Sequence, residues 1–216
     1  MLYDFLKRTC DIIGAFIALV LSSPVILAVA IIIKLTSEGP IFYKPLRVGK
    51  NGKLFEMFKF RSMSMYKIHG KFVHAEKYLE QNPKLMKQYQ KNSYKLTDDP
   101  RITSIGKILR KFSLDELPQL INVLIGDMSL VGPRAYQSDE LIHQQKVYPK
   151  TCNYVKIILK TRPGASGPWQ VSGRSFINFD KRVEMDAQYV KRRSILYDFY
   201  VIIKTPIAMI TGEGAI

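Results

Sequence analysis

Residues 107–120 read Lys-Ile-Leu-Arg-Lys-Phe-Ser-Leu-Asp-Glu-Leu-Pro-Gln-Leu, and they place two adjacent carboxylates, Asp115 and Glu116, among basic residues where a helix is expected to begin. Ser113, followed three residues later by Glu116, fits a capping box, and acidic side chains in a first turn complement the helix dipole. An Asp at this position is expected to stay ionised, as a carboxylate nucleophile must be. From the spacing alone, the simpler interpretation is that both acids only cap the helix.

A longer run reverses that preference. Residues 113–134, Ser-Leu-Asp-Glu-Leu-Pro-Gln-Leu-Ile-Asn-Val-Leu-Ile-Gly-Asp-Met-Ser-Leu-Val-Gly-Pro-Arg, closely resemble the signature of the monotopic bacterial sugar transferases, which load a sugar 1-phosphate onto a polyprenyl phosphate. The resemblance continues through residues 59–63, 162–164 and 169–174, so it covers nearly the whole chain. In this family the Asp of the Asp-Glu pair is regarded as the nucleophile that takes the phosphosugar, a role that falls here on Asp115.

Composition limits the chain to one core of ordinary size. The chain has 216 residues, and no linker rich in Pro, Gly or Ser divides it. Its formal net charge of +15 attracts anionic lipid, nucleotide phosphates or nucleic acid, and charge alone does not choose among them. Cys10, Cys152 and the three histidines show no metal-ligand spacing, so no structural zinc site is expected.

Residues 12–33 are apolar and uncharged, over about the ~20 residues that a helix needs to cross a bilayer core. A cleavable signal peptide is disfavoured because Lys34 follows directly, without a small-residue cleavage site. A buried soluble helix is disfavoured because the segment is apolar all round and lacks an amphipathic stripe. Insertion into a membrane is therefore the leading interpretation.

The middle of this segment decides between a single crossing and a turn back. Ser23 and Pro24 follow Ser22, and a proline there should break or sharply kink the helix. Basic residues flank both ends, which favours both ends on the cytoplasmic side: Lys7, Arg8, Lys34, Lys44 and Arg47. These residues favour re-entry only slightly over one crossing. The resemblance, whose members carry a similar Ser-Pro break in a re-entrant helix, strengthens re-entry.

The predicted fold class is α/β: a small mixed α+β, cytosol-facing catalytic domain, residues 37–216, after a membrane-inserted re-entrant helix-break-helix, residues 1–36. Residues 41–43 and 54–60 bracket a turn signal at 49–52 and predict a hairpin. Residues 105–112 have helical spacing, and a second helix is expected from about 114 to 125, with Gly126 as its stop.

Three further segments have weaker patterns. Residues 74–96 are charged and helical in pattern, interrupted by Pro83, and residues 161–174 are expected to form an irregular surface loop. Residues 195–203 predict a C-terminal helix that either lies in the lipid headgroup plane or docks on the core.

The implied reaction moves a sugar 1-phosphate from a UDP-sugar to undecaprenyl phosphate in a ping-pong scheme through an aspartyl intermediate. All reacting groups are anionic, so Mg²⁺ is the expected cofactor, with Asp115, Glu116 and Asp186 as candidate ligands. Glu116 could bind the metal or help deprotonate the acceptor, and Asp186 could instead position a basic partner. The cationic candidates for phosphate or carboxylate contacts are Arg110, Arg134, Lys59, Arg61, Arg162 and Arg174.

The insertion near residues 64–97 and the C-terminal sequence resemble members that transfer hexose 1-phosphate, which favours UDP-galactose or UDP-glucose over an N-acetylated sugar. The expected location is the cytoplasmic face of a bacterial inner membrane, where anionic lipid is a further partner and homo-oligomers are possible, in exopolysaccharide, capsule or O-antigen synthesis. A non-enzymatic, membrane-anchored basic binding protein would leave the Asp-Glu motif unexplained, and no nucleic-acid module is recognised. A metal-dependent phosphatase is the other alternative.

Overall fold

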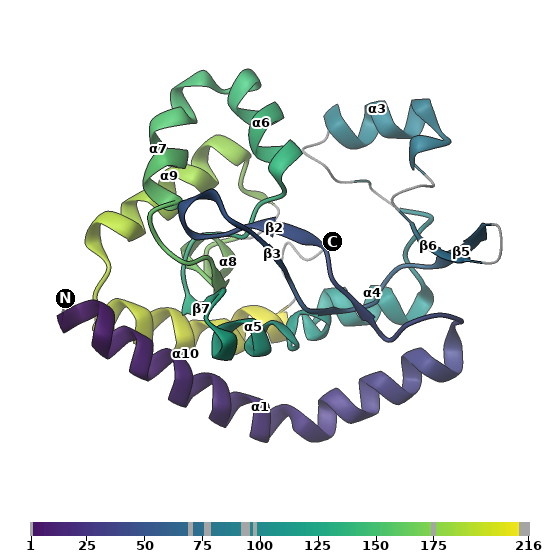
Figure 1. The fold of residues 1–216 in the computed structure, drawn as a ribbon, viewed down its shortest axis with the longest axis horizontal. Coiled ribbons are helices and arrows are strands. Elements are labelled where there is room, and N and C mark those ends of the chain that lie inside the picture. Colours follow the sequence, from purple (N-terminus) through teal and green to yellow (C-terminus); the bar gives the residue numbers. More distant parts are fainter. Residues whose placement is uncertain are drawn as a thin grey trace.

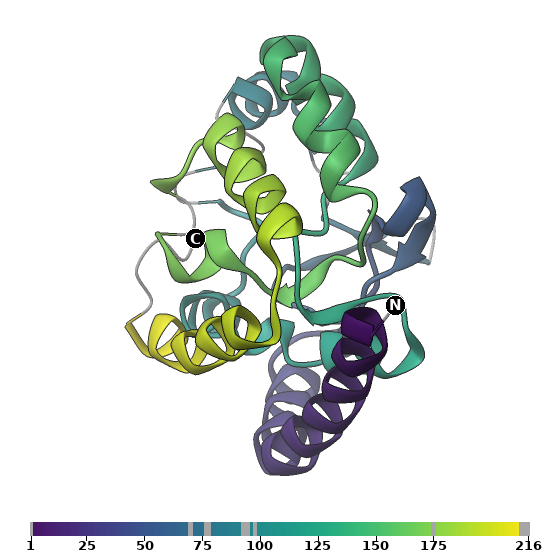
Figure 2. The ribbon, with the colours of Figure 1, turned by 90° about the vertical axis from the view of Figure 1, so that its left-hand side faces the viewer.

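The computed structural model describes residues 2–68, 71–75, 79–91, 96, 99–173 and 176–211, with the backbone alone at 66–68 and 71–74. A single 35-residue helix, α1 (Leu2–Thr36), runs along the bottom of Figure 1, and the remaining elements lie above it. By length and composition, α1 could cross a membrane. Figure 2 shows α1 and α10 (Ile195–Thr211) at one end of the molecule, with α6 (Ser138–Val147) at the opposite end.

Helix α1 is continuous but bent near its middle (Figure 1), so of the break or sharp kink predicted at Ser23 and Pro24 the structure has a bend and no break. Pro24 has no amide hydrogen to donate to the carbonyl of Val20, four residues earlier. The Ser23 Oγ donates to that Val20 oxygen at 2.8 Å, and the Ser22 Oγ donates to the Ala18 oxygen at 2.6 Å. The serine hydroxyls thus replace the missing ladder contact, which lets the helix bend without ending.

Polar contacts hold the first arm of α1, residues 2–22, against the part of the fold that follows α1. The guanidinium of Arg8 donates to the carbonyl oxygens of Val123 and Leu124 at 2.7 and 2.9 Å. The buried Asp11 accepts from the Ser129 Oγ at 2.8 Å and from the Leu130 amide at 3.0 Å. These contacts fix the first arm beneath the elements that carry the carboxylate pair.

The second arm, residues 25–36, is fastened by apolar packing. Val29 and Ile33 are buried against Phe60 and Leu109. Near the bend, at the end of the first arm, Leu21 remains exposed, with 75% of its surface accessible. Both arms of α1 therefore contact the part of the fold that follows α1, and the bend between the arms presents an apolar surface.

The predicted hairpin is confirmed, although it forms in two pieces. Strand β1 (Phe42–Tyr43) pairs antiparallel with β4 (Lys59–Phe60), and β2 (Leu46–Val48) pairs antiparallel with β3 (Leu54–Glu56). The turn η1 (Lys50–Gly52) joins β2 to β3, and Asn51 adopts the left-handed backbone that such turns need.

The segment predicted as helical over 74–96 is preceded by a second hairpin that ends at His74, and its described residues 79–80 and 83–91 are helical. Strands β5 (Met65–Ile68) and β6 (Lys71–His74) pair antiparallel, and α3 (Pro83–Lys91) begins at Pro83. A proline fits the first turn of a helix, where its missing amide would have no partner. Pro83 therefore starts α3, and the predicted interruption lies just before it, between α3 and the helical residues 79–80.

Helix α4 (Ser104–Lys111) confirms the helical spacing, and the Thr103 hydroxyl caps it by accepting from the Gly106 amide. The next predicted helix is divided. A 3₁₀ turn, η2 (Leu114–Glu116), precedes α5 (Gln119–Ile125), and Gly126 stops α5 with φ 96°. Pro118 has no amide to donate to the Leu114 carbonyl, which accepts from the Leu117 amide at 3.3 Å instead.

The remaining elements surround a short parallel pair. Strand β7 (Ser129–Val131) pairs with β8 (Gly164–Ser166), and a Cβ at Gly132 would lie only 2.7 Å from the backbone of residues 162 and 164. The other helical elements are α6, η3 (Pro149–Thr151), α7 (Cys152–Ile158), α8 (Pro168–Val171), α9 (Phe179–Arg192) and α10. Residues 161–174 are therefore not the irregular loop expected, because β8 and α8 lie within them, and the C-terminal helix is confirmed.

Candidate active site

The carboxylate pair lies in the 3₁₀ turn η2, beside the hairpin. Asp115 is buried, with 7% of its surface exposed, and Glu116 is partly exposed. Lys59 of β4 places its Nζ 2.6 Å from Glu116 Oε1 and 3.7 Å from Asp115 Oδ2. A contact between residues 57 positions apart thus brings a cation to both predicted catalytic acids.

The backbone of this turn differs from the predicted capping box. Ser113 adopts a left-handed conformation with φ 53°, and its side chain makes no capping bond to η2. A non-glycine residue is uncommon in this region of backbone space, and such residues cluster at functional sites. The prediction that Ser113 and Glu116 cap one long helix is therefore wrong, since Glu116 binds Lys59 and Gln170.

Asn122 of α5 holds the hairpin against the carboxylate turn. Its side chain is fully buried; Oδ1 accepts from the Phe58 amide at 2.8 Å, and Nδ2 donates to the Glu56 oxygen at 2.8 Å. Phe58 immediately precedes Lys59, so these two bonds fix the position from which Lys59 reaches Glu116. Nothing in the local pattern distinguished Asn122 from other residues of an amphipathic helix.

The electrostatics of Asp115 oppose the sequence-based expectation. Burial raises the pKa of Asp115, the Lys59 ammonium lowers it, the Glu116 carboxylate raises it again and the Arg110 guanidinium lowers it. Burial outweighs the nearby cations, so the pKa stands above its ordinary value. The raised pKa runs against the expectation that the start of a helix favours the ionised form, and the charges of Lys59 and Arg110 are what favour the carboxylate form of Asp115.

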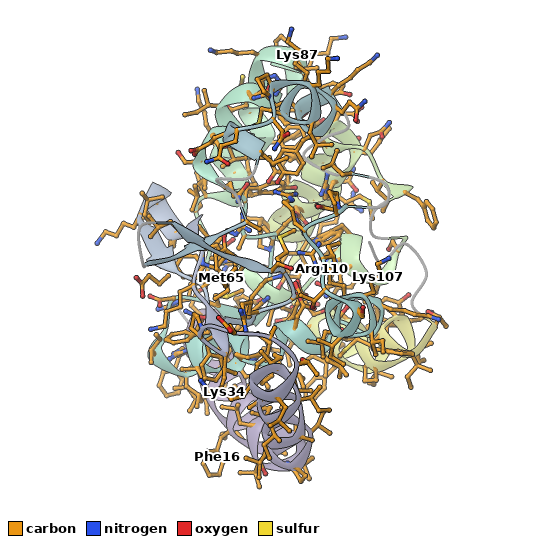
Figure 3. All side chains as sticks on the ribbon, turned by 90° about the vertical axis from the view of Figure 1, so that its right-hand side faces the viewer. Phe16, Lys34, Met65, Lys87, Lys107 and Arg110 are labelled. Atoms are coloured by element: carbon orange, nitrogen blue, oxygen red, sulfur yellow. The ribbon has the colours of Figure 1, made fainter. Side chains whose placement is uncertain are left out.

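Arg110 and Gln170 complete the surroundings of the pair. Arg110 Nε donates to the Ser62 Oγ at 2.9 Å, which orients a guanidinium whose charge acts on Asp115. Figure 3 labels Arg110 at mid-height, between α1, marked by Phe16, and α3, marked by Lys87. Gln170 Nε2 donates to Glu116 Oε2 at 3.3 Å. Gln170 lies in a segment that carried the family resemblance, but it was not among the predicted site residues.

Arg134 and Asp186 form a second group beside α8. The Arg134 amide donates to Asp186 Oδ2 at 2.9 Å, and the Arg134 guanidinium carbon lies 4.7 Å from the centre of the Trp169 ring. Burial raises the pKa of Asp186 to about 7, against the hydrogen bond from Arg134 and the charge of Arg182. Asp186 thus holds the backbone of Arg134, which is compatible with the predicted role of positioning a basic partner, and that role stays a prediction.

Two of the predicted phosphate-binding arginines are engaged by the backbone. Arg61 is buried and donates to the Ser37 carbonyl at 3.0 Å and to the Glu38 carbonyl, so it holds the chain just after α1. Arg162 Nε donates to the Gly126 carbonyl at 2.7 Å, at the end of α5. Arg174, also predicted, lies outside the described residues.

The described part of the chain holds no group of three or more His, Cys, Asp or Glu side chains that could bind a metal ion. Asp186 is therefore not brought together with Asp115 and Glu116 as a ligand set. Mg²⁺ commonly binds through one or two carboxylates together with substrate phosphates, and an adjacent Asp and Glu fit that donor set. The hard oxygen donors and their ion pairs with Lys59 are consistent with a site where substrate completes the coordination.

Comparison with known proteins agrees with this geometry. Residues 2–212 match the model of the family described as bacterial sugar transferase. The chain is 43% identical over 98% of its length to the undecaprenyl-phosphate galactose phosphotransferase of Salmonella typhimurium, of which it spans 42%. It is 35% identical over 93% of its length to the UDP-glucose:undecaprenyl-phosphate glucose-1-phosphate transferase of Escherichia coli, of which it spans 39%.

A shorter relative is covered almost completely. The chain is 39% identical over 97% of its length to the exopolysaccharide production protein ExoY of Sinorhizobium fredii, and spans 87% of that protein. The chain thus spans less than half of the two longer relatives and most of the shorter one. Since the family model matches nearly every residue, the chain belongs to the bacterial sugar transferase family.

Proposed function

We propose that the protein is a phosphoglycosyl transferase that moves a sugar 1-phosphate from a UDP-sugar to undecaprenyl phosphate. The observation that carries the proposal is the buried Asp115 beside Glu116, with the Lys59 Nζ 3.7 Å from Asp115 Oδ2 and 2.6 Å from Glu116 Oε1. Burial disfavours the ionised form of this carboxylate, and the facing cations favour it. Such a balance is typical of a nucleophile whose charge is maintained by the residues around it. The names of the two longer relatives support undecaprenyl phosphate as acceptor and a hexose as the sugar, and one of these names gives UDP-glucose as the donor.

In this mechanism an Asp115 oxygen attacks the phosphorus nearer the sugar. A bond forms between that oxygen and phosphorus, and the bond from phosphorus to the UMP oxygen breaks, so UMP leaves with the electron pair. An oxygen of undecaprenyl phosphate then attacks the same phosphorus and releases the Asp115 carboxylate. Glu116 is suited to accept a proton from the incoming phosphate, and Lys59 offsets the charge of both carboxylates.

Asp115 and Glu116 are the residues that would hold Mg²⁺, which would neutralise negative charge on the phosphates. Arg110 keeps positive charge directed at Asp115, because its hydrogen bond to Ser62 restricts the guanidinium. Arg134, set by its amide bond to Asp186, supplies a planar fork for a phosphate oxygen pair. These side chains bind and orient substrates whose charge would otherwise oppose the attack.

Membrane placement follows from α1. Both arms of α1 contact the catalytic part, and its exposed apolar bend suits a re-entrant helix that returns to the face it entered. This arrangement would place residues 37–216 on the cytoplasmic face of the inner membrane, with basic residues against anionic lipid. The exposed apolar residues of α10, such as Leu196 and Ile203, would lie in the same headgroup region.

The donor is proposed to be UDP-galactose or UDP-glucose, with a UDP-N-acetylated sugar as the alternative. Release of UMP should be measured for each UDP-sugar in detergent with undecaprenyl phosphate and Mg²⁺. Mass spectrometry of protein mixed with donor alone should find one sugar phosphate added to a peptide that contains Asp115. The Asp115→Asn variant should remain folded, release no UMP and gain no adduct; turnover near the wild-type rate in that variant would refute the covalent scheme.

A further inference from the structure

Three arginines from distant parts of the chain meet behind α8. Arg134 follows β7, and Arg182 lies in α9. Arg47 lies in β2, which reaches this region because the amide of the next residue, Val48, donates to the Tyr136 carbonyl at 2.9 Å. The guanidinium carbons of Arg134 and Arg182 lie 4.7 and 5.6 Å from the centre of the Trp169 ring, and 6.0 and 5.9 Å from that of Tyr136. The two rings therefore hold two guanidinium groups side by side.

These arginines have unused hydrogen-bonding capacity. The Nε atoms of Arg47, Arg134 and Arg182 are buried, and none has a hydrogen-bond partner among the described residues. Arg182 has only 1% of its surface exposed. A buried donor on a charged group is costly to leave unpaired, so this arrangement indicates a missing acceptor.

Repulsion among the guanidinium groups points to the same conclusion. The charge of Arg134 lowers the pKa of Arg47 and of Arg182, after the larger effect of burial on each. Glu140 and Asp186 are the buried carboxyl groups that oppose this charge. Since burial raises the pKa of Asp186 to about 7, Asp186 is only partly ionised at neutral pH. Three cations thus face fewer than two full negative charges.

Helix α8 joins this arginine cluster to the carboxylate pair. Trp169, which carries the guanidinium groups, is followed by Gln170, which donates to Glu116 Oε2 at 3.3 Å. An anion bound by the cluster would therefore lie beside the reacting carboxylates. In Figure 1, β2 and α9 lie well above the bend of α1, and a lipid tail would reside at that bend.

We propose that Arg47, Arg134 and Arg182 together bind the phosphate of the nucleotide, the group that leaves as UMP when Asp115 is loaded. This inference rests on the proposed function and adds Arg47 and Arg182 to its substrate-binding residues. A nucleotide phosphate has two or three oxygens to accept from the unpaired donors, and arginine forks match that geometry. The distance of the cluster from the α1 bend favours the water-soluble nucleotide over the isoprenoid phosphate.

The test compares Arg182→Met and Arg47→Met with wild type, because methionine keeps much of the length and apolar packing but removes the charge. Calorimetry in detergent should show that each variant binds UMP roughly 10–100-fold more weakly. The KM for the UDP-sugar should rise by a similar factor, with the KM for undecaprenyl phosphate within about twofold of wild type. Arg192→Met, on the exposed face of the same helix, is the matched control and should change neither quantity.

Three other results would overturn the phosphate site, the nucleotide assignment or the proposed function. UMP affinity within about twofold of wild type in folded Arg47→Met and Arg182→Met would overturn the phosphate site. A rise in the KM for undecaprenyl phosphate alone would assign the cluster to the lipid and overturn the nucleotide assignment. If Arg182→Met does not fold, Arg182→Lys and Arg47→Met give the same test. Failure of the wild type itself to bind or release UMP would instead refute the proposed function.

Discussion

Asn122 joins the hairpin to the helix that follows the carboxylate turn, so replacing it tests how much this connection contributes to stability and activity. Replacing Asn122 by Leu keeps the side-chain volume nearly constant but removes the acceptor for the Phe58 amide and the donor for the Glu56 carbonyl. Both backbone groups would then be buried without a partner, because Asn122 is fully inaccessible. The substitution therefore tests buried polar contacts with little contribution from a cavity.

The expected magnitude follows from the two unpaired groups. Each buried group left unsatisfied costs about 1–3 kcal/mol, so Asn122→Leu should destabilise the protein by about 2–6 kcal/mol. For a chain of this size each kcal/mol lowers Tm by roughly 2–4 °C, which gives a minimum decrease of about 4 °C. Turnover should also fall, by up to about 100-fold, because a displacement of about 1 Å at Lys59 would lengthen its contact with Glu116.

Thermal unfolding in detergent at one scan rate, with UMP release measured well below Tm, gives both quantities. Asn178→Leu is the matched control, since Asn178 is exposed at the start of α9 and its side chain makes no capping bond there. The control should leave Tm and turnover close to wild type. An Asn122→Leu protein with the wild-type Tm would show that these hydrogen bonds do not hold the hairpin in place.

Three other predictions test the site and the anchor. Lys59→Met removes the cation that lowers the pKa of Asp115, so the acidic limb of the pH–rate profile should move to higher pH, whereas Lys59→Arg should keep it in place. An unmoved limb in Lys59→Met would assign Lys59 to substrate binding alone. Burial raises the pKa of Asp186 from 3.8 to about 7, so between these pH values Asp186 holds a proton in the folded chain and loses it in the unfolded chain. The free energy of unfolding of the wild type should therefore fall by up to about 4 kcal/mol from pH 4 to 7. Asp186→Asn should lack this loss, so its Tm should rise relative to wild type over that range, and parallel Tm curves would contradict the burial argument. Ser23→Ala with Pro24→Leu should straighten α1 and move the N-terminus to the outer face of the membrane. A cysteine introduced at the N-terminus should then react with a membrane-impermeant thiol reagent in intact cells. If that cysteine stays protected from the reagent, the bend does not set the membrane topology of α1.

Local patterns predicted much of the secondary structure, because those elements depend on neighbours in sequence. The long apolar helix, the hairpin around residues 49–52, helix α4 and the C-terminal helix were all predicted from spacing and turn residues. Prolines set where these helices begin, divide and bend, and the division at Pro118 was not predicted. Pro83 starts a helix, Pro118 divides one, and Pro24 bends one whose freed carbonyl is paired by Ser23.

Sequence by itself, through the family resemblance, also singled out Asp115 and Glu116, because the motif around them is continuous in the chain. Tertiary structure alone decided what faces them. The Lys59 contact, the anchoring by Asn122 and the gathering of Arg134 and Arg182 on Trp169 join residues tens of positions apart. Burial of Asp115 and Asp186, which sets the direction of each pKa, likewise arises only when separate elements pack and exclude water, so no local spacing encodes it.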